Sequence, residues 1–266
     1  MSTVHPVPRV QTTARPATRR GATIAGMGRS IPPRVVGNRE LERLVDTSDA
    51  WIVERTGIRE RRVAPDGVAT SDLAVEAAKD ALQDAGIDAR DVDLILVGTA
   101  SPDMLFPATA CLVQHRLGAT RAGAFDVSAA CSSWAYAAAM GHAAIACGMA
   151  ETVLVIGAET LSRITDWTDR ATCVLFGDAA AAAVLRPCAA DQGFLAFHLG
   201  ADGAGVWLAG HKGLLELKAS VGLGNMAAVH LRAVVAGGVV QTCFVQNALQ
   251  HLNDAEGRAA GLGDPP

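Results

Sequence analysis

Hydrophobic and polar positions follow two different periods along the first two-thirds of the chain. Leu73, Ala77, Ala81 and Leu82 recur at helical spacing, and Gly86 ends that run. Short apolar runs bounded by glycine are typical of buried strands. The pattern predicts helices and strands as follows: helices at 70–86, 106–119 and 131–148, and strands at 22–28, 91–101, 122–130, 151–159 and within 172–187.

Strands that alternate with helices of this length indicate βαβ units and a mainly parallel sheet. The sequence therefore predicts an α/β fold. After about Gly205 turn residues no longer divide the sequence clearly into separate apolar segments. In that region we expect a helix near 225–235 and a strand near 238–245.

Composition narrows the functional class. The chain has 266 residues, of which 50% are hydrophobic, so it can bury a sizeable core. A net charge of -4 gives no overall basic field for nucleic acid. Although the mean hydropathy is +0.25, charged or polar residues interrupt every apolar run before it reaches membrane-spanning length. We therefore expect no nucleic-acid partner and no membrane span.

The six cysteines are widely spaced and form no CxxC pair or zinc pattern. Reduced, mostly buried thiols in a cytoplasmic protein are expected rather than disulfides, and no metal site is expected.

Residues 1–21 contain four arginines, several threonines and prolines, and no acid. We expect a disordered arm, with an organelle transit peptide as the alternative. The domain prediction adds an N-terminal half at 22–187 and an incomplete, divergent C-terminal half at 188–266.

The stretch "AFDVSAACSSWAYAAAMG" runs from a strand through small residues into a helix that begins at Cys131. A cysteine at a helix N-terminus is near unpaired N–H groups and the positive end of the dipole, which lower a thiol pKa. Cys131 is therefore a candidate nucleophile for covalent acyl transfer. The alternative is a small buried core residue, which is a common place for free cysteine.

Five stretches carry a family resemblance, in order and at matching spacing. They are "VDTSDAWIVERTGIRERR", "FPATACLVQ", "AFDVSAACS", "TDRATCVLFGDAAAAAVL" and "HLGADGAG". The chain resembles β-ketoacyl-acyl-carrier-protein synthase III from residue 22 to 205. The resemblance implies a thiolase-like fold with two similar halves and a homodimer. It implies acyl transfer from acyl-CoA to Cys131, then decarboxylative condensation with malonyl-acyl-carrier-protein to start fatty-acid chains. No cofactor is implied, since the CoA thioester is a substrate.

The same resemblance implies roles for five further residues. Trp51 and Arg170 match the positions that stack on the two faces of the CoA adenine. Arg55 matches a basic position near the CoA phosphates, and Thr47 a polar position at the same site. Phe106 matches a dimer contact that closes the partner's acyl pocket. Without the resemblance, these residues could equally be core or solvated surface residues.

Asp178 could be read as a catalytic acid, but an acid after glycine is more typical of a residue that fixes a turn by hydrogen-bonding backbone. The family has glycines where this chain has Ala179–Ala183. If those positions needed positive φ or tight packing, alanine would be unfavourable there.

The resemblance ends after about Gly205. The family's histidine and asparagine motifs, Pro-His-Gln-Ala-Asn and Gly-Asn-Thr-Ser, are absent from this sequence. A changed reading frame or a truncated copy would explain this, and we expect condensation to be impaired. Two alternatives stay open: a CoA-dependent polyketide starter acyltransferase, and a non-catalytic dimerising remnant. The tail residues that could substitute are His211, His230, His251, Asn225, Asn247 and Asn253.

Overall fold

The computed structural model describes residues 20–170, 172–197, 199, 232–235 and 238–241. The arm predicted at 1–21 falls almost entirely outside this range, as do the six tail histidines and asparagines. Those expectations and the domain boundaries therefore stay predictions.

A five-stranded sheet forms the centre of the fold, in the order β1-β7-β6-β4-β5. β4, β5 and β6 pair in parallel, and β7 is antiparallel to both β6 and β1. Four strands therefore point the same way and β7 opposes them, which confirms the mixed, mainly parallel sheet. The bounds are β1 Arg20–Ser30, β4 Leu94–Gly98, β5 Gly123–Val127, β6 Val153–Thr160 and β7 Asp178–Ala189.

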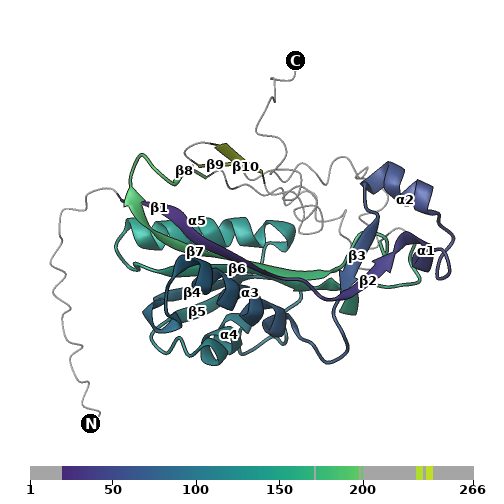
Figure 1. The fold of residues 1–266 in the computed structure, drawn as a ribbon, viewed down its shortest axis with the longest axis horizontal. Helices are drawn as coiled ribbons and strands as arrows, with labels where there is room; N and C mark the ends of the chain where they lie inside the picture. The colour runs from purple at the N-terminus through teal and green to yellow at the C-terminus, as the bar shows by residue number, and fades with distance from the viewer. Residues whose placement is uncertain (1–19, 171, 198, 200–231, 236–237, 242–266) are drawn as a thin grey trace, which may run out of the picture.

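Helices cover both faces of this sheet (Figure 1). α3 (Thr70–Ala85) and α4 (Thr109–Leu117) pack on one face, and α5 (Ser133–Ala146) packs on the other. Alternate residues of each strand face opposite sides, so one strand supplies two cores. On β6, Leu154 and Ile156 join the core under α3, whereas Val153 and Val155 join the core under α5.

α5 approaches the sheet closely because two strands carry glycine beneath its first turn. A Cβ on Gly98 would lie 2.7 Å from the Ser133 carbonyl carbon and the Trp134 nitrogen. A Cβ on Gly157 would lie 3.2 Å from the Trp134 ring. The start of α5 is therefore held against the carboxyl ends of β4 and β6.

A smaller unit lies beyond that end of the sheet (Figure 1). It contains β2 (Arg34–Gly37) paired antiparallel with β3 (Glu60–Val63), with α1 (Asn38–Leu41) and α2 (Asp49–Thr56) between them. Its own core includes Ile52, Cys173 and Val174. The segment after β6 therefore packs into this unit before the chain returns as β7.

Asp178 ties the unit to the sheet. Its buried carboxylate accepts hydrogen bonds from Ala64 N at 2.7 Å, Ser162 N at 2.9 Å and the Ser162 hydroxyl at 2.6 Å. The expected hydrogen bonding to backbone is confirmed, but the expectation that Asp178 fixes its own turn is wrong, because its partners Ala64 and Ser162 lie on two other segments.

The run of alanines at 179–183 can be compared with the expectation that alanine would be unfavourable there. Ala179–Ala183 lies within β7. Ala130 is the one non-glycine residue with positive φ in the described ranges, so none of these five alanines has the strain of a positive φ.

The helix expected near 225–235 is wrong at its end, where β9 (Arg232–Val235) pairs with β10 (Gly238–Gln241). Pairing with a neighbouring strand outweighs local helix preference there. β9 also pairs with β8 (Phe194–Ala196).

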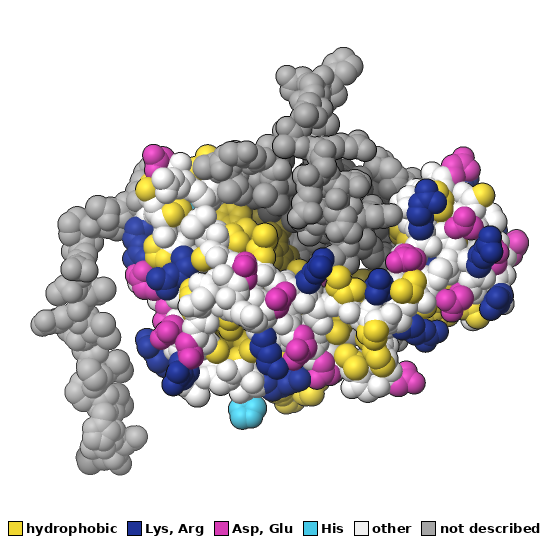
Figure 2. Space-filling model, viewed as in Figure 1, with side chains coloured by type: hydrophobic (Ala, Val, Ile, Leu, Met, Phe, Trp, Pro, Cys, Tyr) yellow, Lys and Arg dark blue, Asp and Glu magenta, His cyan; other side chains and the backbone are white. Residues whose placement is uncertain are grey.

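The surface differs between the two sides of the sheet (Figure 2). Hydrophobic side chains gather near α5, whereas acidic and basic side chains are interspersed over α3 and α4. In the part of the chain that the structure describes, none of the helices is long and apolar enough to cross a membrane.

Candidate active site

Cys131 lies in a tight turn between β5 and α5. The turn is a 3₁₀ segment, η2 (Ala130–Ser132), and α5 begins directly after it at Ser133. Ala130 has a φ of 48°, a left-handed conformation that residues with a Cβ adopt at some cost. This strand–turn–helix geometry leaves Cys131 exposed. The thiol is therefore accessible, and the alternative of a buried core residue does not hold.

Ser133 holds this turn in shape. Its hydroxyl donates to the Ala130 carbonyl at 2.6 Å and accepts from Ala129 N at 2.7 Å. Ser132 N also donates to the Ala129 carbonyl at 3.1 Å. The hydroxyl therefore supports the left-handed residue that precedes the thiol.

The expected lowering of the Cys131 pKa is wrong. Protein atoms that crowd the thiol raise its pKa, and the negative charge of Glu159 raises it further. The thiol is partly open to solvent, so this crowding removes only part of its hydration. Lost hydration and the nearby negative charge destabilise the thiolate more than the backbone hydrogen bond of Cys131 stabilises it, so the pKa of the thiol rises. The sequence argument considered the helix end alone.

Glu159 is a site residue that sequence reasoning missed. It is the second-last residue of β6 and 8% exposed. Its carboxylate accepts from Ala100 N at 2.8 Å, from the Thr99 hydroxyl at 3.3 Å and from the Ser101 hydroxyl. Burial raises the pKa of Glu159, and these hydrogen bonds oppose the rise. A lone acid at the end of the apolar run "VLVIGAE" was the available signal.

Trp51 is the centre of a second cluster, on α2. The Arg55 guanidinium lies 4.8 Å from the Trp51 ring centroid, and the Arg170 guanidinium lies 5.1 Å from it. Arg55 is one helical turn after Trp51, whereas Arg170 comes from the segment between β6 and β7. The structure therefore brings together the aromatic and guanidinium groups that the resemblance assigned to CoA.

The surroundings of this cluster are mostly exposed. Arg170 contacts the fully exposed Asp46 at 3.5 Å, and Ser48 caps α2 by accepting from Trp51 N at 3.2 Å. The Thr47 hydroxyl oxygen is buried and has no hydrogen-bond partner among the described residues. Thr47 directly follows Asp46 along the chain, and its unpaired hydroxyl is available to a polar ligand.

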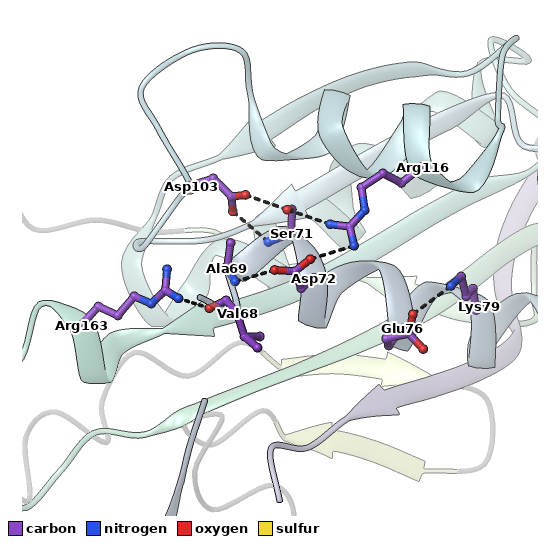
Figure 3. Close-up of polar contacts among 9 residues, drawn as sticks. All are labelled: Val68, Ala69, Ser71, Asp72, Glu76, Lys79, Asp103, Arg116 and Arg163. Carbon is purple, nitrogen blue, oxygen red and sulfur yellow. Dashed lines mark hydrogen bonds and ion pairs between the residues drawn. The ribbon is translucent and has the colours of Figure 1, made fainter. Parts of the chain in front are cut away.

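Phe106 lies in the loop between β4 and α4, where its side chain is 84% exposed and that of Leu105 is 95% exposed. Asp103 anchors this loop: it accepts from Ser71 N at 2.8 Å and from the Ser71 hydroxyl at 2.6 Å (Figure 3). Arg116 of α4 donates to the same hydroxyl at 3.2 Å. The loop is therefore fixed at its base while its apolar tip is free.

Arg116 also forms an ion pair with Asp72 at 2.7 Å, and Asp72 accepts from Ala69 N at 2.6 Å at the start of α3 (Figure 3). Arg163 donates to the Val68 carbonyl in the same region. This network joins the segment before α3, the β4–α4 loop and the segment after β6.

The candidate residues share one end of the sheet. Cys131, Phe106 and Glu159 lie at or beyond the ends of β5, β4 and β6, and these three strands are parallel. Thr160 pairs with Asp178, which ties the Trp51 unit to that same end. Ligands of open α/β sheets commonly bind at the carboxyl ends of the strands.

Comparison with known proteins adds the decisive observation. A model of the 3-oxoacyl-[acyl-carrier-protein] synthase III family matches residues 125–203. The chain is 54% identical over 185 residues to β-ketoacyl-[acyl-carrier-protein] synthase III of Geobacillus kaustophilus, covering 70% of this chain and 60% of that protein. Over this part of its length the chain is similar to β-ketoacyl-[acyl-carrier-protein] synthase III. Its described fold is thiolase-like.

Further relatives agree. The synthase III of Rhodospirillum centenum is 57% identical over 186 residues, covering 68% of this chain and 58% of that protein. The crystal structure of synthase III from Aquifex aeolicus superimposes with a TM-score of 0.67 at 47% identity, covering 69% of this chain and 59% of that chain. The priming β-ketosynthase of the R1128 polyketide pathway gives 0.68 at 34% identity, covering 73% and 58%. The chain thus spans less than two-thirds of the length of these relatives.

Proposed function

We propose that this chain is an acyltransferase of the β-ketoacyl-acyl-carrier-protein synthase III type, which takes an acyl group from acyl-CoA onto Cys131. The observation that carries the proposal is an exposed cysteine on a strand–turn–helix junction, at the same end of the sheet as the Trp51 cluster. The similarity to synthases that are 54% and 57% identical supports it.

The proposed reaction needs one nucleophile and no metal or cofactor. The Cys131 thiol loses its proton, and the thiolate attacks the thioester carbonyl carbon. A new C–S bond forms to Cys131, the C–S bond to CoA breaks, and the released CoA thiolate takes up a proton. A backbone N–H donor at this turn would stabilise the oxyanion of the intermediate. The N–H groups of Ser132 and Ser133 already donate to the Ala129 and Ala130 carbonyls.

CoA is proposed to bind at the Trp51 cluster. Its adenine would insert between the Trp51 ring and the Arg170 guanidinium, with Arg55 near the phosphates and Thr47 supplying a hydroxyl. Two stacking gaps need about 7 Å between the outer planes. Arg170 now lies 5.1 Å from the ring and is 44% exposed, so it must move outward, and its exposure permits this.

The full reaction has two further partners. Malonyl-acyl-carrier-protein would lose CO2 to give an enolate, which attacks the acyl group on Cys131 and releases the cysteine thiolate. A second copy of the chain would form a homodimer. Exposed Phe106 and Leu105, and the position of β5 at the edge of the sheet within the described residues, support such an interface.

A cytoplasmic location completes the proposal, supported by the five free cysteines of the described ranges. We expect condensation by this chain to be weak or absent, because the family's histidine and asparagine motifs do not occur in its sequence. The second candidate is a polyketide starter acyltransferase, favoured by the similarity to the R1128 priming β-ketosynthase. A non-catalytic dimerising remnant is the remaining alternative.

The test is mass spectrometry of the full chain after incubation with labelled acetyl-CoA, with the modified residue mapped. We expect the label on Cys131, lost in Cys131→Ala and kept in Cys147→Ala, a matched control because Cys147 is an exposed cysteine at the other end of α5. Equal labelling of Cys131→Ala and the unchanged chain would refute the proposal. Malonyl-acyl-carrier-protein is then added, and a normal rate of ketoacyl product would contradict impaired condensation. Replacing acetyl-CoA with longer acyl-CoA donors tests the starter-enzyme alternative.

A further inference from the structure

Glu159 extends from the sheet on the same side as Cys131. Residues of β6 alternate between its two faces, and Val153 and Val155 pack in the core under α5. Gly157, the next residue on that face, contacts the Trp134 ring in the first turn of α5. Glu159 follows two residues later, so its side chain lies on the α5 face, toward the N-terminal end of that helix. That end carries the Cys131 turn.

The carboxylate of Glu159 has hydrogen-bond donors but no cation. Ala100 N and the hydroxyls of Thr99 and Ser101 all lie on the segment that leaves β4. None of the ion pairs among the described residues includes Glu159. Hydrogen bonds hold the carboxylate in place without cancelling its net charge. A buried charge of this kind acts over several ångströms because little water screens it.

We propose that Glu159 is a positioning residue for the Cys131 thiol: its buried carboxylate disfavours the thiolate and so sets the pH range in which Cys131 reacts. The Ser101 and Thr99 hydroxyls keep that carboxylate at the carboxyl end of the sheet. The inference rests on the proposed acyl transfer to Cys131 and adds which group sets the pH range of that reaction. Its test, however, needs no acyl donor.

Other ionisable groups near the Cys131 turn are either hydrogen-bonded to other segments or lie further along α5. Asp126 of β5 faces α4, where it accepts from Thr109 N at 2.7 Å and Ala110 N at 2.8 Å. The first turn of α5 contains no acidic residue. His142 lies near the other end of α5 against Phe197, and burial lowers its pKa, which favours its neutral form. Glu159 is therefore the residue whose charge should be removed to test the effect on Cys131.

The sign of the effect follows from the ionised forms. Crowding by protein atoms and the Glu159 charge both raise the pKa of Cys131, so at neutral pH the thiol form is favoured. Below that pKa, each unit of downward shift raises the thiolate fraction about tenfold. Removing the carboxylate charge must therefore increase the reactivity of Cys131. A defect that exposed the thiol would also lower its pKa, because crowding is the larger cause of the rise. A variant without this charge must therefore match the unchanged chain in circular dichroism and thermal denaturation before the profiles are compared.

The decisive experiment is the rate of Cys131 alkylation by iodoacetamide across a range of pH, with each cysteine mapped by mass spectrometry. In Glu159→Gln we expect alkylation about three- to tenfold faster near pH 7, with a profile that fits one titration rather than two coupled ones. Cys147 provides the internal reference. The matched control is Glu151→Gln, which makes the same change beyond the opposite end of β6, about 26 Å away along the strand.

A superimposable profile for folded Glu159→Gln would overturn the inference. If that variant does not fold, Glu159→Met decides: it also removes the charge and keeps a side chain of similar length, so the Cys131 profile must shift in the same direction, and an unshifted profile overturns the inference equally. The two proposals fail separately. A shifted alkylation profile without acetyl labelling would refute acyl transfer alone, whereas labelling with an unshifted profile would refute the role of Glu159.

Discussion

The Cys131 turn and the Trp51 cluster lie at the same end of the sheet but are held in place in different ways. Backbone conformation, the Ser133 hydroxyl and close packing on Gly98 fix the turn. The Trp51 cluster depends instead on partly exposed guanidinium groups that stack on one ring. Residues that orient a reacting atom need fixed geometry, whereas a large ligand such as CoA can displace a partly exposed arginine side chain. Substitutions should therefore lower stability more in the Cys131 turn than in the Trp51 cluster.

The largest effect is expected from Gly98→Ala. Its Cβ would lie 2.7 Å from the backbone of Ser133 and Trp134, so α5 must move away from the sheet. We expect a loss of about 3 kcal/mol in the free energy of unfolding, or no folded protein. Thermal and urea denaturation followed by circular dichroism measure it. Gly123→Ala is the control, because its Cβ meets nothing closer than 3.6 Å. Equal stability of the two variants would show that the turn is not packed as described.

Asp178→Asn tests the connection between the two regions. An amide presents one oxygen where the buried carboxylate now receives three hydrogen bonds, from Ala64 N, Ser162 N and the Ser162 hydroxyl. We expect a loss of about 2 kcal/mol in the free energy of unfolding, together with weaker acetyl-CoA labelling. Asp191→Asn, at an exposed position, should change neither. Lost labelling without lost stability would place Asp178 in the chemistry rather than in the framework.

Trp51→Ala tests the exposed cluster. Removing the ring should raise the acetyl-CoA concentration that gives half-maximal labelling about tenfold, since stacking on a flat cation or base contributes about 1 to 2 kcal/mol. Stability should fall by less than in Gly98→Ala because Trp51 is only partly buried. Trp51→Phe keeps an aromatic face and should recover most of the binding. Unchanged half-maximal labelling in Trp51→Ala would move CoA away from this cluster.

The smallest effect is expected from Ala130→Gly. Glycine adopts a φ of 48° without the Cβ strain that alanine has there, although it loses more entropy on folding. The net result should be a gain of about 0.5 kcal/mol in the free energy of unfolding, measured by urea denaturation. Ala129→Gly, where φ is -146°, should instead lower stability. The same sign for both variants would contradict the left-handed turn.

Sequence patterns predicted much of this architecture because they are local. The apolar stripe of 70–86 corresponds to α3, and the strand before Cys131 corresponds to β5. The Trp51 and Arg170 pairing followed from a resemblance, since 119 positions separate the two residues along the chain. The pKa of Cys131 could not be predicted from its own segment. Its main determinants are crowding in the folded state and a carboxylate on β6, which lies two strands away in the sheet.

The stacking of Arg55 and Arg170 on Trp51 has an optical consequence. The chain contains four tryptophans, and both of the cation–π contacts found in the described ranges involve Trp51. An adenine that replaced one guanidinium group would change the polarity and electron-accepting character of the surroundings of that indole alone. Intrinsic fluorescence should therefore report occupancy directly, with Trp51→Phe supplying the baseline emission.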